Sequence, residues 1–228
     1  MDFLPLDYKF QNNYEIEGYI DETEFSNVYL VSKFNKKYVI KECFPKSITI
    51  RDDDLKIFTN KNIEKFNLVK NSFQREKEIL EKLDKNKDVI NLVNFFEENN
   101  TIYLVLEYFE GINLKKYVLE NELPEKEILQ IFLEIVKIVI EIHDECVIHR
   151  DIKPSNILIN GKNEIKIIDF GTGLLKGNRN GDYIKVTEGY SALEMYSLKT
   201  EIDERSDVYS LCALLYFMLE KKKLKKYF

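Results

Sequence analysis

The chain has 228 residues, of which 44% are hydrophobic, enough for one or two domains with real cores. Its net charge of −6 gives no support to nucleic-acid binding as the main role, and no apolar run reaches the roughly 18 residues of an integral membrane segment. The three cysteines show no CxxC spacing, and the first seven residues lack a basic flank and an apolar signal core. We therefore expect a cytoplasmic protein.

Three strand-like stretches follow one another between Tyr14 and Lys41, separated by polar turns at residues 21–24 and 33–37. Strand–turn–strand–turn–strand is typical of a sheet that covers a nucleotide. The last stretch contains ValIleLys, which is similar to the V-A-I-K element whose lysine contacts the α- and β-phosphates of ATP. For Lys41 taken alone, a solvated lysine on a strand is the better interpretation.

A long amphipathic helix is predicted from Asn62 to Leu83, because apolar residues recur there with a period close to 3.6. Glu76 lies three residues from Phe73, which belongs to the apolar face of this helix. Glu78 is the competing partner for Lys41, but at about 100° per residue it points roughly 160° away from Glu76. We therefore expect Glu76 to pair with the lysine, although a glutamate on a helix is usually solvated surface.

The segments on either side of this helix differ in character. Between Lys41 and the helix lies a long charged insert that contains Arg51 and the run Asp52 to Asp54. Because a run of charges is usually solvated, we interpret the insert as an exposed loop. After the helix, residues 91–96 and 101–107 are predicted to form a pair of strands.

A change from strands to helices follows this strand pair. The segment GluTyrPheGluGly, residues 107–111, is interpreted as a hinge between two lobes. Leu106 before it fits either the back wall of a nucleotide pocket or plain core, and both interpretations predict burial. Leu114 to Leu119 starts a helix, and Pro124 with the acidic residues after it opens a second one through Ile142. This second helix is apolar over much of its circumference, so we expect it to be central and buried.

The most specific stretch of the chain is His149 to Asn156, which reads HRDIKPSN, with Asp169-Phe170-Gly171 a short distance beyond it. Two short alternating stretches joined by a polar turn at residues 161–163 separate the two motifs and predict a hairpin. In the kinase signature set, the first motif supplies a catalytic Asp, a Lys and a Mg²⁺-binding Asn, and the second supplies the main Mg²⁺-binding Asp. The DFG tripeptide alone recurs by chance, whereas the octapeptide at this distance from it is specific.

A loop rich in Gly, Lys and Asn occupies residues 171–187 and carries hydroxyl groups at Thr172, Tyr183 and Thr187. Residues 188–194, GluGlyTyrSerAlaLeuGlu, stand in the place of an A-P-E motif. Phosphorylation of one of these hydroxyls would add charge that a nearby arginine could bind.

The last part of the chain is predicted to be a single apolar helix at residues 208–219. Asp207 starts this helix and is expected to hold the backbone of the catalytic loop, with a bare helix cap as the alternative. His143 is interpreted as capping or packing the end of the helix before that loop. The lysine-rich end of the chain is interpreted as a solvated helix end rather than as a membrane-binding or nucleic-acid-binding tail.

Taken in this order, the motifs resemble those of the eukaryotic-like protein kinases, from about Tyr14 to Leu219. LysGluCysPhePro after the strand lysine is similar to a bacterial serine/threonine group of that superfamily. The resemblance implies an α+β, two-lobed protein-kinase-like fold. A small β-sheet lobe with one main helix would span residues 1–107, and a mostly helical second lobe, truncated after its central helix, would span residues 108–228.

The resemblance also implies roles for the residues of the catalytic loop. Asp151 would accept the proton of the substrate hydroxyl, and Lys153 would steady the γ-phosphate, in the form typical of serine/threonine kinases. Asn156 and Asp169 would hold Mg²⁺. Thr187 looks like the threonine that contacts the catalytic Asp.

Further roles concern the nucleotide and the supporting residues of the loop. The backbone of Glu107 and Phe109 would meet the adenine edge of ATP. The other implied nucleotide-binding residues are Lys41, Glu76, Val28, Val39 and Leu158. His149 would be structural, packing against the Phe of the DFG motif, and Arg150 would receive a phosphate placed on Thr172 or Thr187.

Three departures from the family pattern stand out. The glycine positions of the G-x-G-x-x-G turn carry Asp21, Thr23 and Ser26, so we expect weakened but not abolished ATP binding. Leu193 replaces the proline of A-P-E. The chain stops after the Asp207 helix, which we expect to leave apolar surface uncovered and open to a partner or to self-association.

The function predicted from these patterns is transfer of the γ-phosphoryl group of ATP to a Ser or Thr hydroxyl of a protein substrate. The alternative is a pseudokinase that senses a nucleotide or binds a partner, which the missing glycines favour. A small-molecule kinase is a third interpretation, disfavoured because such relatives generally lack the lysine at position 153.

Overall fold

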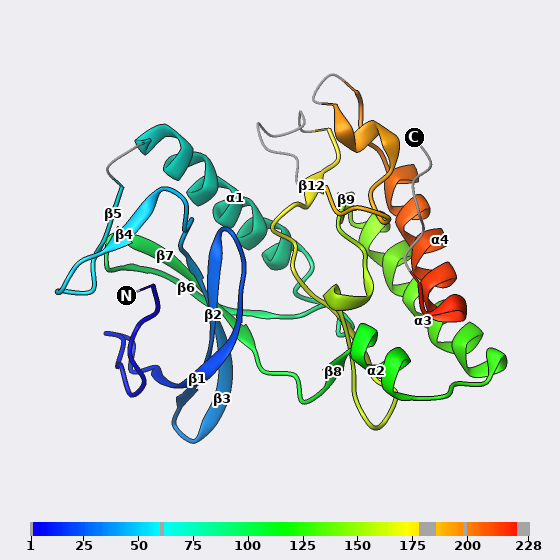
Figure 1. The fold of residues 1–228 in the computed structure, drawn as a ribbon, viewed down its shortest axis with the longest axis horizontal. Helices are drawn as coiled ribbons and strands as arrows, with labels where there is room; N and C mark the ends of the chain where they lie inside the picture. The colour runs from blue at the N-terminus through cyan, green and yellow to red at the C-terminus, as the bar shows by residue number, and fades with distance from the viewer. Residues whose placement is uncertain (1, 60–61, 178–185, 198–199, 223–228) are drawn as a thin grey trace. The chain divides into compact units, whose positions relative to one another are not determined.

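The computed structural model describes residues 2–59, 62–177, 186–197 and 200–222, so Tyr183 and residues 223–228 lie outside the described residues (Figure 1). The chain forms two compact units. The first unit comprises Met1–Lys77 and Asn91–Tyr108, and the second comprises Glu78–Ile90 and Phe109–Phe228. The predicted division into domains at residues 107 and 108 stays a prediction.

The first unit is built on a five-stranded antiparallel sheet with the order β1-β2-β3-β7-β6. Its strands are β1 (Glu15–Glu22), β2 (Ser26–Lys33), β3 (Lys36–Cys43), β6 (Leu92–Glu98) and β7 (Thr101–Glu107). All five were expected from the sequence, which confirms both predicted strand groups. The β2–β3 turn has positive φ at both Phe34 and Asn35, as a tight two-residue hairpin turn requires.

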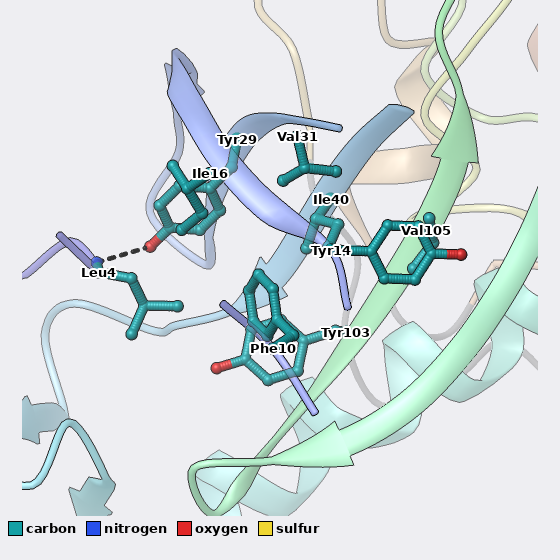
Figure 2. Packing of buried hydrophobic residues seen from close by; sticks show 9 residues of the cluster. All are labelled: Leu4, Phe10, Tyr14, Ile16, Tyr29, Val31, Ile40, Tyr103 and Val105. Atoms are coloured by element: carbon teal, nitrogen blue, oxygen red, sulfur yellow. Dashed lines mark hydrogen bonds between the residues drawn. The ribbon is translucent and has the colours of Figure 1, made fainter. Parts of the chain in front are cut away.

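The N-terminal segment, residues 2–10, covers one face of this sheet (Figure 2). Leu4 and Phe10 are buried there against strand residues that include Tyr29, Ile40 and Tyr103. The aromatic rings of Phe10 and Tyr103 pack edge to face at a centroid distance of 5.1 Å, an arrangement that aromatic pairs prefer. No secondary structure was predicted for this segment, because it is too short to show a periodic pattern.

The structure of the charged insert before the first helix differs from the prediction. It contains a two-stranded hairpin, β4 (Thr49–Arg51) and β5 (Ile57–Thr59), rather than an exposed loop. The run Asp52 to Asp54 is exposed at the turn, as expected, but the Arg51 side chain is only 1% exposed. The prediction failed for the arginine because the sequence does not reveal its buried carboxylate partner. Helix α1 (Ile63–Lys82) follows and confirms the predicted helix.

Among the described residues, three helices lie wholly in the second unit: α2 (Leu114–Glu120), α3 (Glu125–Asp144) and α4 (Arg205–Glu220). Helix α3 begins directly after Pro124, as predicted, and carries Glu125 and Glu127 in its first turn, where the helix dipole favours negative charge. Helices α3 and α4 lie side by side (Figure 1). Helix α4 starts earlier than predicted, so Asp207 lies in its first turn instead of preceding it.

Short strands and turns complete the second unit and carry the loop motifs. The strands are β8 (Ile112–Asn113), β9 (Val147–Ile148), β10 (Ile157–Ile159), β11 (Ile165–Ile167) and β12 (Leu174–Leu175). They form a β11-β10-β8 sheet and a β12-β9 pair, and the β10–β11 hairpin between the two motifs is confirmed. Two short 3₁₀ turns span Pro154–Asn156 and Leu193–Tyr196.

Helix α4 carries exposed apolar side chains. On α4, Val208 is 51% exposed and Leu219 is 43% exposed. Among the described residues, no helix is both long enough and apolar enough to cross a membrane. Self-association through the apolar surface stays a prediction.

The three cysteines should differ in reactivity. Burial raises the pKa of the Cys43 thiol to about 12, whereas Cys146 and Cys212 are exposed. We expect iodoacetamide at a pH near 8.5 to alkylate Cys146 and Cys212 in the folded protein and to reach Cys43 only after denaturation. Peptide mass spectrometry measures this, and alkylation of all three at equal rates would show that β3 is not buried as described.

Candidate active site

The Asp151 side chain is the centre of a hydrogen-bonded cluster in the second unit. It is 3% exposed and lies in the loop between β9 and the 3₁₀ turn at Pro154–Asn156. Its Oδ2 accepts hydrogen bonds from Lys153 Nζ at 2.6 Å and from Asn156 Nδ2 at 3.0 Å. Its Oδ1 accepts from Thr187 Oγ1 at 2.7 Å, which confirms the predicted contact. Both carboxylate oxygens are thus oriented, so the group is held in one position.

Asp207 holds the backbone of this loop from α4. Its side chain is fully buried, and its carboxylate accepts the backbone N–H groups of His149 and Arg150, each at 2.8 Å. Arg150 has a φ of +66°, so these N–H groups turn away from any regular ladder and need another acceptor. The predicted role of Asp207 is confirmed. His143 places Nε2 2.9 Å from the same carboxylate, so it contacts this aspartate instead of capping its own helix.

His149 has a structural role, as predicted. Its ring packs on Phe170 of the DFG motif, with ring centroids 4.6 Å apart. Its Nε2 lies 3.2 Å from the carbonyl oxygen of Ile168, and its Nδ1 accepts the backbone N–H of Asp151 at 3.2 Å. Both ring nitrogens are therefore engaged with the backbone, which leaves neither for proton transfer.

Asn156 and Asp169, the expected metal ligands, are brought together by backbone pairing. The N–H of Ile168 donates to the carbonyl of Asn156 at 3.0 Å, and Asp169 is the next residue, with a φ of +65°. The amide nitrogen of Asn156 donates to the backbone carbonyl of Asp151 at 2.9 Å, which leaves the amide oxygen as the free acceptor. An amide oxygen and a carboxylate fit Mg²⁺, which prefers oxygen ligands and one or two carboxylates. Their role in metal binding stays a prediction.

In the first unit, Lys41 and Glu76 form a nearly buried ion pair. Lys41 Nζ lies 2.9 and 2.8 Å from the two carboxylate oxygens, and the side chains are 13% and 1% exposed. This contact confirms the choice of Glu76 over Glu78. A carboxylate at that depth needs such a partner, because an unpaired buried charge is strongly destabilising.

The other nucleotide-binding candidates of the first unit share the sheet face that carries Lys41. Val28 is its direct cross-strand partner, and Val39 lies two residues before it on the same strand, so their side chains point to the same side. Leu106 pairs with Val39 and is 9% exposed, which both of its interpretations predicted. Glu107 ends β7, and its N–H donates to the carbonyl of Asn91.

Phe109 and Leu158 belong to the second unit. Leu158 is half-buried in β10 between two buried isoleucines, so it lies on the opposite face of that strand. Phe109 is half-buried, and its ring lies beside Gly111. A Cβ on Gly111 would lie 2.7 Å from both the Phe109 ring and the carbonyl oxygen of Ile159. Glycine is therefore required at this position.

The β1–β2 turn satisfies most of its own backbone donors. Thr23 Oγ1 accepts the N–H groups of Phe25 and Ser26 at 3.2 and 3.1 Å, and the N–H of Thr23 donates to the carbonyl of Ser26. The N–H of Glu22 is taken by the Asp21 carboxylate at 2.8 Å. In a glycine-rich loop such groups are available to phosphates. The acidic side chains of the turn are exposed, so they point outward.

Several supporting residues were not found from the sequence. Ser191 accepts the N–H of Thr187 at 2.8 Å, and Ser206 donates to Glu194 at 2.7 Å. Lone serines carry no sequence signal for such contacts. Thr172 is 8% exposed and donates to the carbonyl of His149, while its own carbonyl accepts from Arg150 Nε. The predicted phosphorylation of this threonine would require the loop to open.

Comparison with known proteins assigns the family. The model of the protein kinase domain matches residues 14–226, so the chain belongs to the protein kinase family. Its fold is similar to the solved structure "PpkA-294 apo form", with a TM-score of 0.82 and 27% identity, covering 96% of this chain and 79% of that one. These matches confirm the resemblance and the fold class predicted from the sequence.

Several of the curated relatives are named as serine/threonine-protein kinases. PrkC of Bacillus subtilis is 33% identical over 155 residues, which cover 64% of this chain and 23% of the relative. Ppk6 of Schizosaccharomyces pombe is 29% identical over 175 residues, which cover 71% of this chain and 23% of the relative. The Aurora kinase of Patiria pectinifera is 28% identical over 213 residues, which cover 92% of this chain and 48% of the relative. The chain thus spans about a quarter to a half of the length of these relatives.

The self-satisfied turn should limit nucleotide affinity. Thr23→Gly frees the N–H groups of Phe25 and Ser26, so we expect Mg²⁺-ATP to bind about threefold more tightly, by one added hydrogen bond. A fluorescent ATP analogue measures the dissociation constant. Thr23→Ser keeps the hydroxyl and serves as the matched control. Equal affinity in the two variants would rule out this role for Thr23.

The Asp207 carboxylate should be essential to the stability of the second unit. Asp207→Ala leaves two buried N–H groups without an acceptor, so we expect a loss of about 2–4 kcal/mol in the free energy of unfolding. Urea denaturation measures this. Glu134→Ala, which removes an exposed pair with Lys137 on α3, is the control and should change little. If both variants lose the same stability, Asp207 does not have the role described.

Proposed function

We propose that the chain is an ATP- and Mg²⁺-dependent protein kinase that phosphorylates Ser or Thr hydroxyls of a protein substrate. The observation that carries this proposal is the Asp151 carboxylate, oriented by Lys153, Asn156 and Thr187 in the second unit. Membership of the protein kinase family and the names of the relatives support it.

The contacts of Asp151 suit a group that takes one proton. As the substrate hydroxyl forms its bond to phosphorus and the bond from phosphorus to ADP breaks, the hydroxyl proton passes to the carboxylate. The Lys153 ammonium lies 2.6 Å from Oδ2 of Asp151, so it carries positive charge beside the transferring group. Thr187 fixes the second carboxylate oxygen and so the direction of proton transfer.

The remaining roles divide between the two units. In the second unit, Asn156 and Asp169 would supply oxygen ligands for Mg²⁺, which would neutralise phosphate charge. In the first unit, Lys41 is held by Glu76 and supplies the ammonium that contacts the phosphates of ATP. The sheet face with Val28 and Val39 supplies apolar contacts for the nucleotide. In the second unit, Leu158 would supply a further apolar contact. The backbone groups of Glu107, in the first unit, and of Phe109, in the second, would meet the adenine edge.

The proposal extends to partners and location. A protein substrate follows from kinase chemistry, while no role in nucleic-acid binding is proposed for a chain of net charge −6. The exposed apolar side chains of α4 are proposed to bind a partner or a second copy. A cytoplasmic location remains part of the same proposal.

A second candidate function is a pseudokinase that binds a nucleotide or a partner without transfer. The β1–β2 turn favours it, because its N–H groups are satisfied by Thr23 and Asp21 instead of remaining available to phosphates. The intact cluster around Asp151 favours the enzyme. The two functions predict the same fold and differ only in turnover.

A transfer assay with labelled ATP and a generic basic protein decides between them. Asp151→Asn removes the proton acceptor but keeps the size of the side chain, so we expect transfer to fall by about 10²-fold or more. Asp144→Asn makes the same chemical change at an exposed site on α3 and should keep full activity.

Nucleotide binding is measured in the same preparations with a fluorescent ATP analogue. Equal background transfer by the wild type and by Asp151→Asn, together with measurable binding, would establish the pseudokinase. The absence of both transfer and binding would overturn the proposal.

A further inference from the structure

We propose that Glu42 is a positioning residue for Lys41, and that the N-terminal segment and the β4–β5 hairpin hold it in place. The two residues are neighbours on β3 and point to opposite faces of the sheet. The inference rests on the proposed function only in that Lys41 is taken as the phosphate-binding lysine. All of the contacts involved lie within the first unit.

The Glu42 carboxylate is fully buried and satisfied from several directions. It accepts hydrogen bonds from Tyr29 OH at 2.7 Å, Tyr103 OH at 2.8 Å and Asn27 Nδ2 at 3.1 Å. Arg51 contributes one guanidinium nitrogen at 2.8 Å from each carboxylate oxygen. A charge removed from water to this extent is tolerated only with such partners. The network is therefore required for Glu42 to be buried in the folded chain.

Two members of the network are also the direct neighbours of Glu42 in the sheet. Asn27 of β2 and Tyr103 of β7 are its cross-strand partners on either side. The same ladders pair Lys41 with Val28 and Leu104. The network therefore forms only in the register that places Lys41 on the opposite face, where Glu76 lies.

Hydrophobic patterning alone would specify this register weakly. The three central strands carry consecutive apolar residues: β3 contains TyrValIle, β2 contains ValTyrLeuVal and β7 contains IleTyrLeuValLeu. Sliding one strand by one residue would still bury apolar side chains on both faces, although it would turn every side chain over. The Glu42 network penalises such a slip, because a slipped Glu42 loses all of its donors.

The N-terminal segment and the hairpin complete the network. The backbone carbonyl of Asp2 accepts from Asn27 Nδ2 at 2.8 Å and from Arg51 at 3.3 Å. The N–H of Leu4 donates to Tyr29 OH, the bond drawn in Figure 2. Arg51 also donates to the carbonyl of Leu55 within its own hairpin. The N-terminal segment and the β4–β5 hairpin, which are distant in sequence, thus position the side chains that donate to Glu42.

A double variant separates positioning from stability. Glu42→Met/Arg51→Met removes both charges and keeps similar volume, a change that buried ion pairs often tolerate. We expect it to remain folded but to bind Mg²⁺-ATP roughly tenfold more weakly, because Lys41 is no longer held in register. Lys9→Met/Glu15→Met, which removes an exposed pair of the same unit, is the matched control and should bind as the wild type does.

A second measurement needs no nucleotide. In the wild type the Lys41 ammonium is paired and 13% exposed, so it should react slowly with an amine acetylating reagent. In the double variant we expect faster acetylation of Lys41 and faster amide exchange across residues 36–43, both read by mass spectrometry. Tyr103→Phe, which removes one donor to Glu42 but keeps the pair with Arg51, should show smaller shifts in the same direction and replaces the double variant if that variant does not fold.

The outcomes distinguish this inference from the proposed function. If the folded variants keep wild-type acetylation and exchange rates, the positioning role is wrong whatever the chain binds. If those rates rise but the wild type binds no nucleotide, the positioning role stands and the proposed function is wrong. If those rates rise and affinity falls in step with a lost free energy of unfolding, Glu42 is only a structural residue.

Discussion

The second unit depends on one buried carboxylate that accepts two backbone N–H groups. Asp207 takes those of His149 and Arg150, at the point where a positive φ turns the chain out of β9. Without an acceptor these donors would draw the loop toward water. With it, the loop presents Asp151 in a fixed direction, and the DFG segment packs its phenylalanine on the His149 ring. Helix α4, which comes much later in the sequence, thereby determines the geometry of the catalytic loop.

The first unit uses buried carboxylates in the same way, but on both faces of one strand. Glu76 pairs with Lys41 on one face, and Glu42 is surrounded by donors on the other. Each carboxylate carries a cationic partner, which makes burial of the charge tolerable. Consecutive residues of β3 thus belong to two separate polar groups, and the alternation of the strand keeps those groups apart.

The sequence predicted what local rules determine and missed what depends on distant partners. Periodicity was sufficient to select Glu76 over Glu78, and the resemblance to the protein kinases was sufficient to predict the contact between Thr187 and Asp151. Arg51 was assigned to an exposed loop because three aspartates follow it, and no local rule reveals a buried carboxylate on another strand. The loss of glycines from the β1–β2 turn was visible in the sequence, but the acceptor role of Thr23 required the backbone geometry.

The order of the strands has a consequence for synthesis of the chain. β3 pairs with β7, and the whole of α1 and the β4–β5 hairpin are made between them. Until residue 107 emerges from the ribosome, β3 is an open edge with unpaired backbone groups, the kind of edge that invites aggregation. The charged residues next to that edge, Lys36, Lys37 and Lys41, are of the type that discourages intermolecular strand pairing. The lysine assigned to phosphate binding would thus first protect the nascent sheet.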